Sequence, residues 1–141
     1  MVHIDVERRG GRVIASTRSP WEPIVGYSRA VRVGPVVAVT GTVGLEEDGS
    51  FSMDAARQTR RAFEILQAAL AAVGSSLDDV VRTRMYVTNI SKWEPIGRVH
   101  GELLGHVRPA TTMVEVTRLI DSRCVVEIEA DAVCAEPASP G

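Results

Sequence analysis

Short apolar stretches in the first third of the chain are separated by glycine and proline, a pattern typical of β-strands joined by turns. Stretches at residues 12–16, 27–33 and 36–40 predict three strands. Gly34 and Pro35 divide the last two, so we expect a tight hairpin in which Gly34 adopts a positive φ. The third stretch is apolar at consecutive positions, which predicts a strand buried on both faces.

The middle of the chain changes to helical spacing. Between residues 52 and 73 the apolar side chains recur every three or four positions, which predicts a long amphipathic helix. Its buried face is expected to comprise Ala56, Thr59, Ala62, Phe63, Leu66, Leu70 and Val73. Gly74 follows where a left-handed C-cap is expected.

A second, shorter helix is predicted to begin after Ser91 and to reach about Leu104. Ser91 and Glu94 have the spacing of a capping box, in which each side chain bonds the other residue's backbone N–H. Pro95 is tolerated because it lies in the first helical turn. The side chains expected to be buried by this helix are Trp93, Ile96, Val99 and Leu103.

Further strands are predicted at residues 80–88, 111–116 and 125–133. The resulting order, β-β-β-α-β-α-β-β, is typical of a two-layer α+β fold in which both helices cover one face of a mixed sheet. The last strand alternates an apolar row with an acidic row, namely Val126, Ile128, Ala130 and Ala132 against Glu127, Glu129 and Asp131. We expect the helices to cover the apolar row, so that the acidic row faces solvent or a partner subunit. Arg82 and Arg84 offer a matching positive row.

Composition narrows the class of protein. With 141 residues, 45% hydrophobic and 24% charged, the chain suits one folded domain, expected over residues 1–134 with a disordered tail at 135–141. A net charge of -2 argues against a duplex-binding protein, and no apolar run approaches the roughly 20 residues of a membrane helix. The histidines and cysteines lack metal-site spacing. We therefore expect a cytoplasmic protein without a metal or cofactor.

Six short motifs give the chain a resemblance to a known family. They are Gly26-Tyr27, Val39-Thr40-Gly41, Gln58-Thr59-Arg60, and the segments at residues 74–81, 109–116 and 126–130. In this order and at these distances they resemble the RidA/YjgF-type proteins, also labelled L-PSP endoribonuclease-like. The resemblance extends from about Gly26 to Val133.

This resemblance implies a chorismate-mutase-like fold and a homotrimer with small-molecule sites in the clefts between subunits. It also implies hydrolysis of reactive 2-imino acids and their enamine tautomers to 2-keto acids and ammonia, without metal or cofactor. In such a site a guanidinium holds the substrate carboxylate with two parallel hydrogen bonds, and a glutamate orients water. The family arginine directly follows Pro-Ala, but in this chain Pro109-Ala110 is followed by Thr111.

The resemblance assigns Glu127 as the catalytic residue that orients water. It assigns substrate binding to Tyr27, Thr40, Gly41, Thr111 and Thr112. A threonine offers one neutral hydroxyl where the family has a charged fork, and losing such a hydrogen bond costs roughly 1.5–3 kcal/mol. Activity on 2-iminopropanoate is therefore expected to be weak or absent. Glu127 would also lack its positive counterpart, which favours a neutral or cationic ligand.

Three functions stay open from the sequence. The first is a cofactor-free hydrolase or deaminase of imines, enamines or related reactive metabolites in an inter-subunit pocket. The second is a trimer that binds or senses a metabolite without turnover, which the missing arginine would also explain. An endoribonuclease or translation-inhibitor role is least favoured, because 4% aromatic residues and a net charge of -2 suit single-stranded RNA poorly. Trp21, in a proline-bounded loop near Tyr27, is either a packing residue or a lid.

Overall fold

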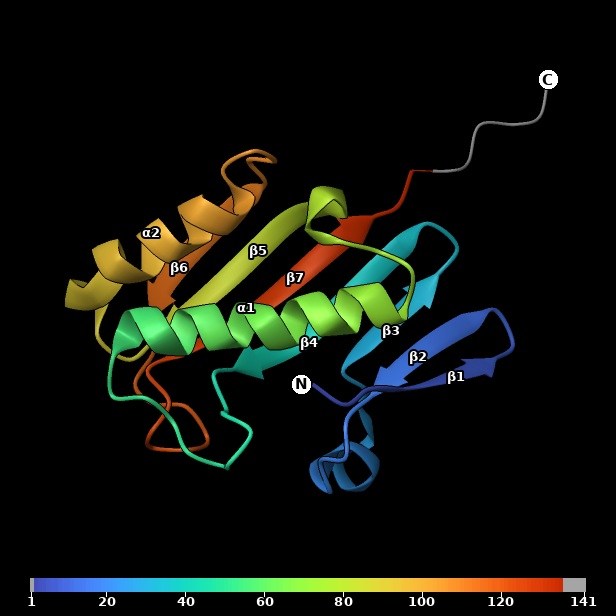
Figure 1. Cartoon of the computed structure of the whole chain (residues 1–141), viewed down its shortest axis with the longest axis horizontal. Coiled ribbons are helices and arrows are strands. Elements are labelled where there is room, and N and C mark those ends of the chain that lie inside the picture. The colour runs from blue at the N-terminus through green and yellow to red at the C-terminus, as the bar shows by residue number, and fades with distance from the viewer. Residues whose placement is uncertain (1, 136–141) are drawn as a thin grey trace.

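The computed structural model describes residues 2–135, which form one mixed sheet with two α-helices on one face (Figure 1). The strands are β1 (Asp5–Arg9), β2 (Arg12–Ser16), β3 (Ala30–Val33), β4 (Val36–Val43), β5 (Val80–Val87), β6 (Ala110–Glu115) and β7 (Val126–Val133). The helices are α1 (Ala55–Ala72) and α2 (Trp93–Leu104). Short helical turns also occur at η1 (Glu22–Gly26), η2 (Leu77–Asp79) and η3 (Ile90–Lys92).

The strands lie in the order β1-β2-β3-β4-β7-β5-β6. β5 and β6 run parallel, whereas the other neighbouring strands are antiparallel. A parallel pair needs a long crossover connection, and α2 provides it. The predicted α+β class, a mixed sheet with both helices on one face, is therefore confirmed.

The first strand, β1, was not predicted. Its sequence reads Asp-Val-Glu-Arg-Arg, and all of its residues are exposed, so it has no apolar face to reveal it. It pairs with β2 through the backbone, with Asp5 opposite Ser16 and Arg9 opposite Arg12. Charged side chains suit such an edge strand because they discourage pairing with another sheet. The observed order is β-β-β-β-α-β-α-β-β, one strand more than predicted.

The core lies between α1 and the central strands of the sheet (Figure 1). Phe63, Leu66 and Leu70 of α1 are fully buried, as are Val126 and Ile128 of β7. The predicted helical face and the predicted apolar row of the last strand are therefore confirmed. The acidic row lies on the opposite face, which no other layer of the described residues covers.

The prediction that residues 36–40 are buried on both faces is wrong. Val37 and Val39 are buried under α1, but Val36 is 56% exposed and Ala38 is exposed as well. The strand alternates because its second face is the uncovered face of the sheet, which we call the open face. The preceding strand is also shorter than predicted, since β3 begins at Ala30 and leaves Tyr27 in the connection before it.

The glycine turns form as predicted. Gly34 has a φ of 57° between paired Val33 and Val36, and Gly74 has a φ of 80° after α1. Helix α1 begins later than expected, because the side chain of Asp54 caps it by accepting a hydrogen bond from the Arg57 N–H.

The predicted capping box of α2 is wrong. Ser91 lies within η3, where its backbone N–H and its hydroxyl both donate to Asn89 Oδ1. Lys92 precedes α2 without a side-chain cap, and Glu94 pairs with Arg98 at 2.7 Å. As a result, Trp93 at the start of the helix is 58% exposed, whereas the predicted Ile96 and Val99 are buried.

Apart from Ala135, the predicted tail at residues 135–141 lies outside the described residues, and the domain boundary at 134 stays a prediction. Among the described residues, no helix has both the length and the apolar character that crossing a membrane requires.

Replacing Gly44 by alanine should destabilise the protein by about 1–3 kcal/mol, because an added methyl group overpacks a close contact. A Cβ at this position would lie 2.3 Å from the carbonyl oxygen of Gln58 in α1, and backbone cannot move aside as a flexible side chain can. Chemical denaturation of wild type and Gly44→Ala measures the loss.

The matched control is Gly101→Ala in α2, where an added Cβ would have no neighbour within 4 Å. Because alanine is the better helix former, this variant should gain about 0.5–1 kcal/mol. Equal stability of the two variants would contradict the close approach of α1 to residue 44.

Candidate functional site

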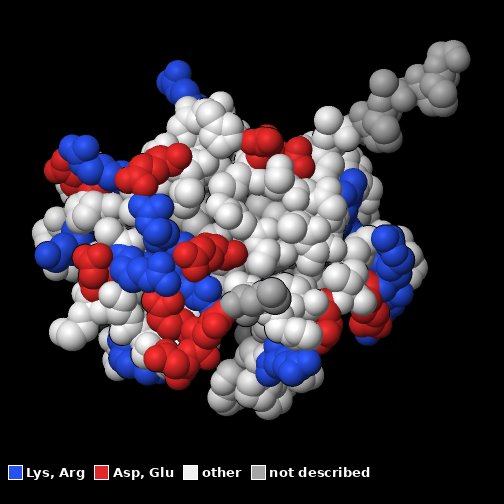
Figure 2. Space-filling view, viewed as in Figure 1, with Lys and Arg blue, Asp and Glu red and all other residues white. Residues whose placement is uncertain are grey.

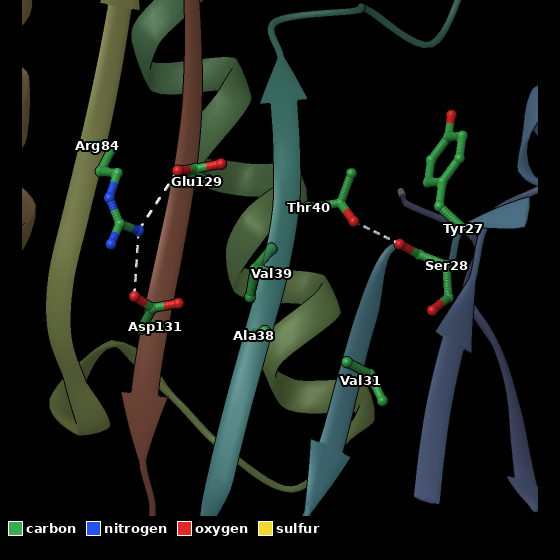
Figure 3. Close-up of a pocket in the computed structure, with 9 residues that line it drawn as sticks. All are labelled: Tyr27, Ser28, Val31, Ala38, Val39, Thr40, Arg84, Glu129 and Asp131. Carbon is green, nitrogen blue, oxygen red and sulfur yellow. Dashed lines mark hydrogen bonds and ion pairs between the residues drawn. The ribbon is translucent and has the colours of Figure 1, made fainter. Parts of the chain in front are cut away.

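The open face carries a cavity of about 330 Å³ (Figure 3). Its lining comprises Tyr27, Ser28, Val31, Ala38, Val39, Thr40, Arg84, Glu129 and Asp131. Two predicted site residues, Tyr27 and Thr40, therefore lie at one cavity. They stand on the β3 and β4 side, and the charged residues come from β5 and β7 (Figure 3).

The charged side of the cavity is an ion-paired group. Arg84 Nη1 lies 3.4 Å from Glu129 Oε1 and 3.2 Å from Asp131 Oδ2. The hydroxyl of Tyr86 donates to Glu129 at 2.9 Å, which raises the pKa of Tyr86. The predicted match between Arg84 and the acidic row is thus confirmed. Arg82 is exposed and forms no such ion pair within the described residues.

Strand β4 contains an irregularity at Thr40 and Gly41, where its register with β7 shifts between Val39 and Thr42. The hydroxyl of Thr40 donates to the Ser28 carbonyl at 2.6 Å, and that of Thr42 donates to the Thr40 carbonyl at 2.7 Å. Such bulges often re-aim side chains beside functional sites. Here the hydroxyl of Thr40 is occupied by a backbone hydrogen bond to Ser28, and Gly41 is the residue of the bulge that contacts the Glu127 side chain.

Glu127 lies directly against Gly41. A Cβ on Gly41 would be 3.0 Å from the Glu127 carboxyl carbon, so only glycine leaves room for the side chain as it stands. Burial raises the pKa of Glu127, Arg29 opposes this rise, and the neighbouring charge of Glu129 adds to it. A carboxyl group whose pKa is raised by burial is a stronger base than an exposed one.

Arg29 is a functional candidate that the sequence analysis missed. Its Nη1 donates to the Gly41 carbonyl at 3.0 Å and to Thr42 Oγ1 at 3.4 Å. Its guanidinium carbon lies 5.7 Å from the centre of the Tyr27 ring, within the range of a cation–π contact. Arg29 also acts electrostatically on Glu127, so a cation other than the family arginine absent at position 111 influences this carboxylate.

No local pattern pointed to Arg29, since a lone arginine before a strand is ordinarily solvated. The one feature of the sequence that could have identified Arg29 is its position two residues after Tyr27 and directly before the buried Ala30. That position places its side chain on the open face beside the bulge, which only the pairing of β3 with β4 determines.

The remaining predicted residues, Thr111 and Thr112, lie elsewhere in the chain. They belong to the edge strand β6, which β5 and β7 separate from β4. The hydroxyl of Thr111 lies 2.8 Å from Thr83 Oγ1 and 3.2 Å from His100 Nε2. Because Thr83 is fully buried beneath the helices, Thr111 faces the helical side and not the cavity. Thr112 is paired with Arg84 and shares its face.

The predicted set therefore divides in two. Tyr27 and Thr40 line the cavity, and Glu127 lies against Gly41 in the adjoining bulge, although Gly41 and Glu127 are not among the lining residues. Thr111 and Thr112 lie at the far edge of the sheet. Burial also lowers the pKa of His100, the partner of Thr111, so its imidazole is neutral at physiological pH.

The loop before Tyr27 is held by a buried carboxylate. Glu22 is 3% exposed, accepts hydrogen bonds from the backbone N–H and the hydroxyl of Thr17, and lies 3.9 Å from Arg29 Nη2. Trp21 and Ile24 are 60% and 69% exposed. Within the described chain, Trp21 is thus no packing residue, which leaves its role as a lid a hypothesis.

A second hollow, of about 650 Å³, lies beside the first turns of α1. It is lined by Glu46, Glu47, Asp48, Ser50, Arg57, Arg61 and Glu64, part of the charged area in Figure 2. Arg57 pairs with Glu46 at 2.7 Å, and Arg61 with Glu64 at 3.0 Å. Both arginines are paired with carboxylates and Arg61 is itself buried, which leaves little free positive charge here for RNA.

Comparison with known proteins identifies relatives over most of the chain. Residues 17–134 match a family described as Endoribonuclease L-PSP. An uncharacterized protein of Streptomyces coelicolor is 38% identical over 115 residues, which cover 81% of this chain and 86% of that protein. A RutC family protein of Pyrococcus abyssi is 34% identical over 122 residues, covering 85% of this chain and 94% of its own length.

Solved structures agree with these sequence matches. Rv2704 of Mycobacterium tuberculosis, described as a member of the YjgF/YER057c/UK114 family, is 51% identical with a TM-score of 0.81, covering 86% of this chain and 98% of its own. RidA from the Antarctic bacterium Psychrobacter is 32% identical with a TM-score of 0.72, covering 76% of this chain and 87% of its own. The chorismate-mutase-like fold is therefore confirmed.

Replacing Glu127 by glutamine should stabilise the protein at pH 8. Burial disfavours the ionised carboxylate in the folded state, so folding carries a penalty wherever the group is charged. The gain should shrink as the pH falls through the raised folded pKa and vanish below the ordinary value of 4.5, where the group is protonated in both states. Thermal unfolding of both proteins across this pH range measures the difference.

Glu129→Gln is the matched control, because Glu129 stands two residues along the same face but bonds Tyr86 and Arg84. Its replacement removes these contacts and should not stabilise the protein. A Glu127→Gln variant less stable than wild type at pH 8 would refute the assigned burial penalty.

Proposed function

The chain belongs to the Endoribonuclease L-PSP family of RidA/YjgF-type proteins, and on this premise we propose that it is a cofactor-free hydrolase of imines or enamines. The observation that carries the proposal is the half-buried carboxylate of Glu127, which lies against Gly41 and under the influence of Arg29. Burial raises the pKa of Glu127, which makes this group a stronger base towards water than an exposed carboxylate.

The proposed reaction converts an iminium ion and water to a carbonyl compound and ammonium. As the water oxygen bonds to the iminium carbon, Glu127 accepts a proton from that water and the C=N electron pair moves to nitrogen. The product is a carbinolamine. Glu127 then returns the proton to nitrogen, the C–N bond breaks, and the departing ammonia takes the hydroxyl proton as the carbonyl forms.

We propose that the working site is completed by a second copy of the chain within a homotrimer. Strand β5 separates Glu127 in β7 from Thr111 in β6, and Tyr27, which precedes β3, lies farther away still, so one chain alone does not assemble the predicted set. Exposed apolar side chains on the sheet, including Val36 at 56%, Val114 at 42% and Val133 at 47%, are consistent with burial between subunits. Cytoplasmic location is part of the same proposal.

The substrate of this site is proposed to differ from 2-iminopropanoate. Thr111 is already bonded to Thr83 and His100, and its hydroxyl is uncharged. It therefore offers no forked cation for a substrate carboxylate. We propose a reactive imine or enamine whose binding does not depend on such a fork.

The same observation favours a second candidate, a trimer that binds a metabolite without turnover. The two functions differ in product. Saturable binding of a neutral or cationic imine analogue without release of ammonia from any tested imine would support the binding trimer and refute the hydrolase.

Glu127→Gln should lower the turnover of an imine substrate by about 10²- to 10⁴-fold, the usual contribution of a general base. Imines generated in solution from a panel of amino acids, with ammonia release or semicarbazone capture as the readout, provide the assay. Glu94→Gln, which removes an exposed carboxylate of α2 outside the cavity lining, is the control and should retain most of the activity. Equal losses in both variants would argue against a specific role for Glu127.

Thr111→Arg should increase activity on 2-iminopropanoate at least about tenfold, because a charge-assisted hydrogen bond contributes roughly 1.5–3 kcal/mol. Thr111→Lys is the control, since it restores the charge without the planar fork and should gain less. No gain with arginine, in a variant that unfolds at the wild-type temperature, would show that position 111 does not face the substrate.

A further inference from the structure

The guanidinium of Arg29 is almost buried and lies between the carboxylate of Glu22 and the Thr40–Gly41 bulge. Its side chain is 13% exposed, and Nη2 lies 3.9 Å from Glu22 Oε2. Nη1 is used by the Gly41 carbonyl and Thr42 Oγ1. The guanidinium thus spans the space between the loop that contains Glu22 and the bulge on which Glu127 rests.

The hydrogen bonding of Arg29 is incomplete. Its Nε is buried and has no hydrogen-bond partner among the described residues. Leaving a buried donor unpaired is unfavourable. A neutral amide could bond the Gly41 carbonyl without this penalty, so hydrogen bonding to the bulge alone does not account for an arginine. The positive charge itself is the remaining property that distinguishes it.

The charges around Glu127 show where that positive charge acts. Glu129 lies two residues along the same strand, and Tyr86 of β5 is the paired residue opposite Glu127. Cys124 lies before β7 and is also sensitive to the charge of Glu127. Arg84, the cation of β5 on this face, is engaged by Glu129 and Asp131. Arg29 is therefore the cation that balances the Glu127 carboxylate.

We propose that Arg29 is a positioning residue for Glu127, which keeps the carboxylate ionised through its charge and holds it in place through the Thr40–Gly41 bulge. The inference rests on the proposed role of Glu127 in hydrolysis. Glu22 completes the arrangement, because its buried carboxylate holds Arg29 from the loop that carries Trp21. Arg29 itself need not touch the substrate.

The test compares Arg29→Gln and Arg29→Lys with wild type by NMR titration of the side-chain carboxyl carbon of Glu127. Glutamine removes the charge, so the titration midpoint should move to higher pH. Lysine keeps the charge and should restore the midpoint towards the wild-type value. The acidic limb of the pH–rate profile for imine hydrolysis should move in the same direction, since protonated Glu127 cannot accept a proton from water.

Arg32→Gln, three residues farther along the chain in β3, is the matched control. Its guanidinium donates to the carbonyls of Gly34, Val73 and Gly74, away from Glu127, so its loss should leave the midpoint unchanged. A wild-type midpoint in Arg29→Gln would overturn the inference. If the glutamine variant does not fold, Arg29→Lys provides the test. A wild-type titration midpoint for Glu127 together with a lowered kcat would support the inference, whereas an unchanged kcat would overturn it.

The titration separates this inference from the proposed function, because it needs no turnover. A shifted midpoint in Arg29→Gln without imine hydrolysis by wild type would support the coupling of Arg29 to Glu127 and refute the hydrolase. Hydrolysis by wild type with an unshifted midpoint would leave the hydrolase supported and refute the role of Arg29.

Discussion

The arrangement of the site depends on one buried amide, that of Gln58 in α1. Gln58 is 1% exposed, and its Nε2 donates to the carbonyls of Ser52 and Arg123 at 2.8 Å each. Its Oε1 accepts from the Val125 N–H at 2.9 Å. With both donors and the acceptor paired, the amide is buried at little penalty. Since Val125 directly precedes β7, this contact fixes the point at which the strand carrying Glu127 enters the sheet.

The backbone carbonyl of Gln58 also fixes how closely the end of β4 approaches α1. Gly44 follows that strand and approaches the Gln58 carbonyl so closely that no side chain fits. The strand that carries Gly41 and the strand that carries Glu127 therefore both meet α1 at Gln58. Their relative position, and with it the contact between Gly41 and the Glu127 carboxylate, follows from how the helix lies on the sheet. The burial that makes Glu127 basic thus follows from the packing on the opposite face.

The sequence predicted the features that neighbouring residues determine, and it missed those that depend on contacts between distant segments of the chain. Helix α1 and the alternation along β7 were predictable because their burial repeats with the period of the element itself. β1 was not, because it is held by backbone pairing and has no apolar side. The wrong N-cap at Ser91 has a similar origin, since Asn89 two residues earlier competes for the same backbone and side-chain groups.

The site residues divide along the same line. Tyr27, Thr40, Gly41 and Glu127 were proposed as site residues from motifs, because each motif is a short run of neighbouring residues. Arg29 was missed, since its contacts with Gly41 and Thr42 depend on the pairing of β3 with β4 and on the bulge in β4, which no local sequence pattern predicts. The direction of Thr111 was also not predictable, because it depends on Thr83 and His100 from two other elements.

The indirect contact between Arg29 and Glu127 has a chemical consequence. Among the described residues the two side chains form no direct ion pair, because Nη1 is bonded to the Gly41 carbonyl and Nη2 lies towards Glu22. A guanidinium bonded directly to a carboxylate lowers its pKa strongly and leaves a weak base. One held at a distance keeps the carboxylate charged without occupying its oxygens. Burial then outweighs the attraction, the pKa of Glu127 stays raised, and the oxygens remain able to accept a proton from water. A missing arginine at position 111 and a present one at position 29 are therefore not equivalent, because the first would hold a substrate anion and the second adjusts a base.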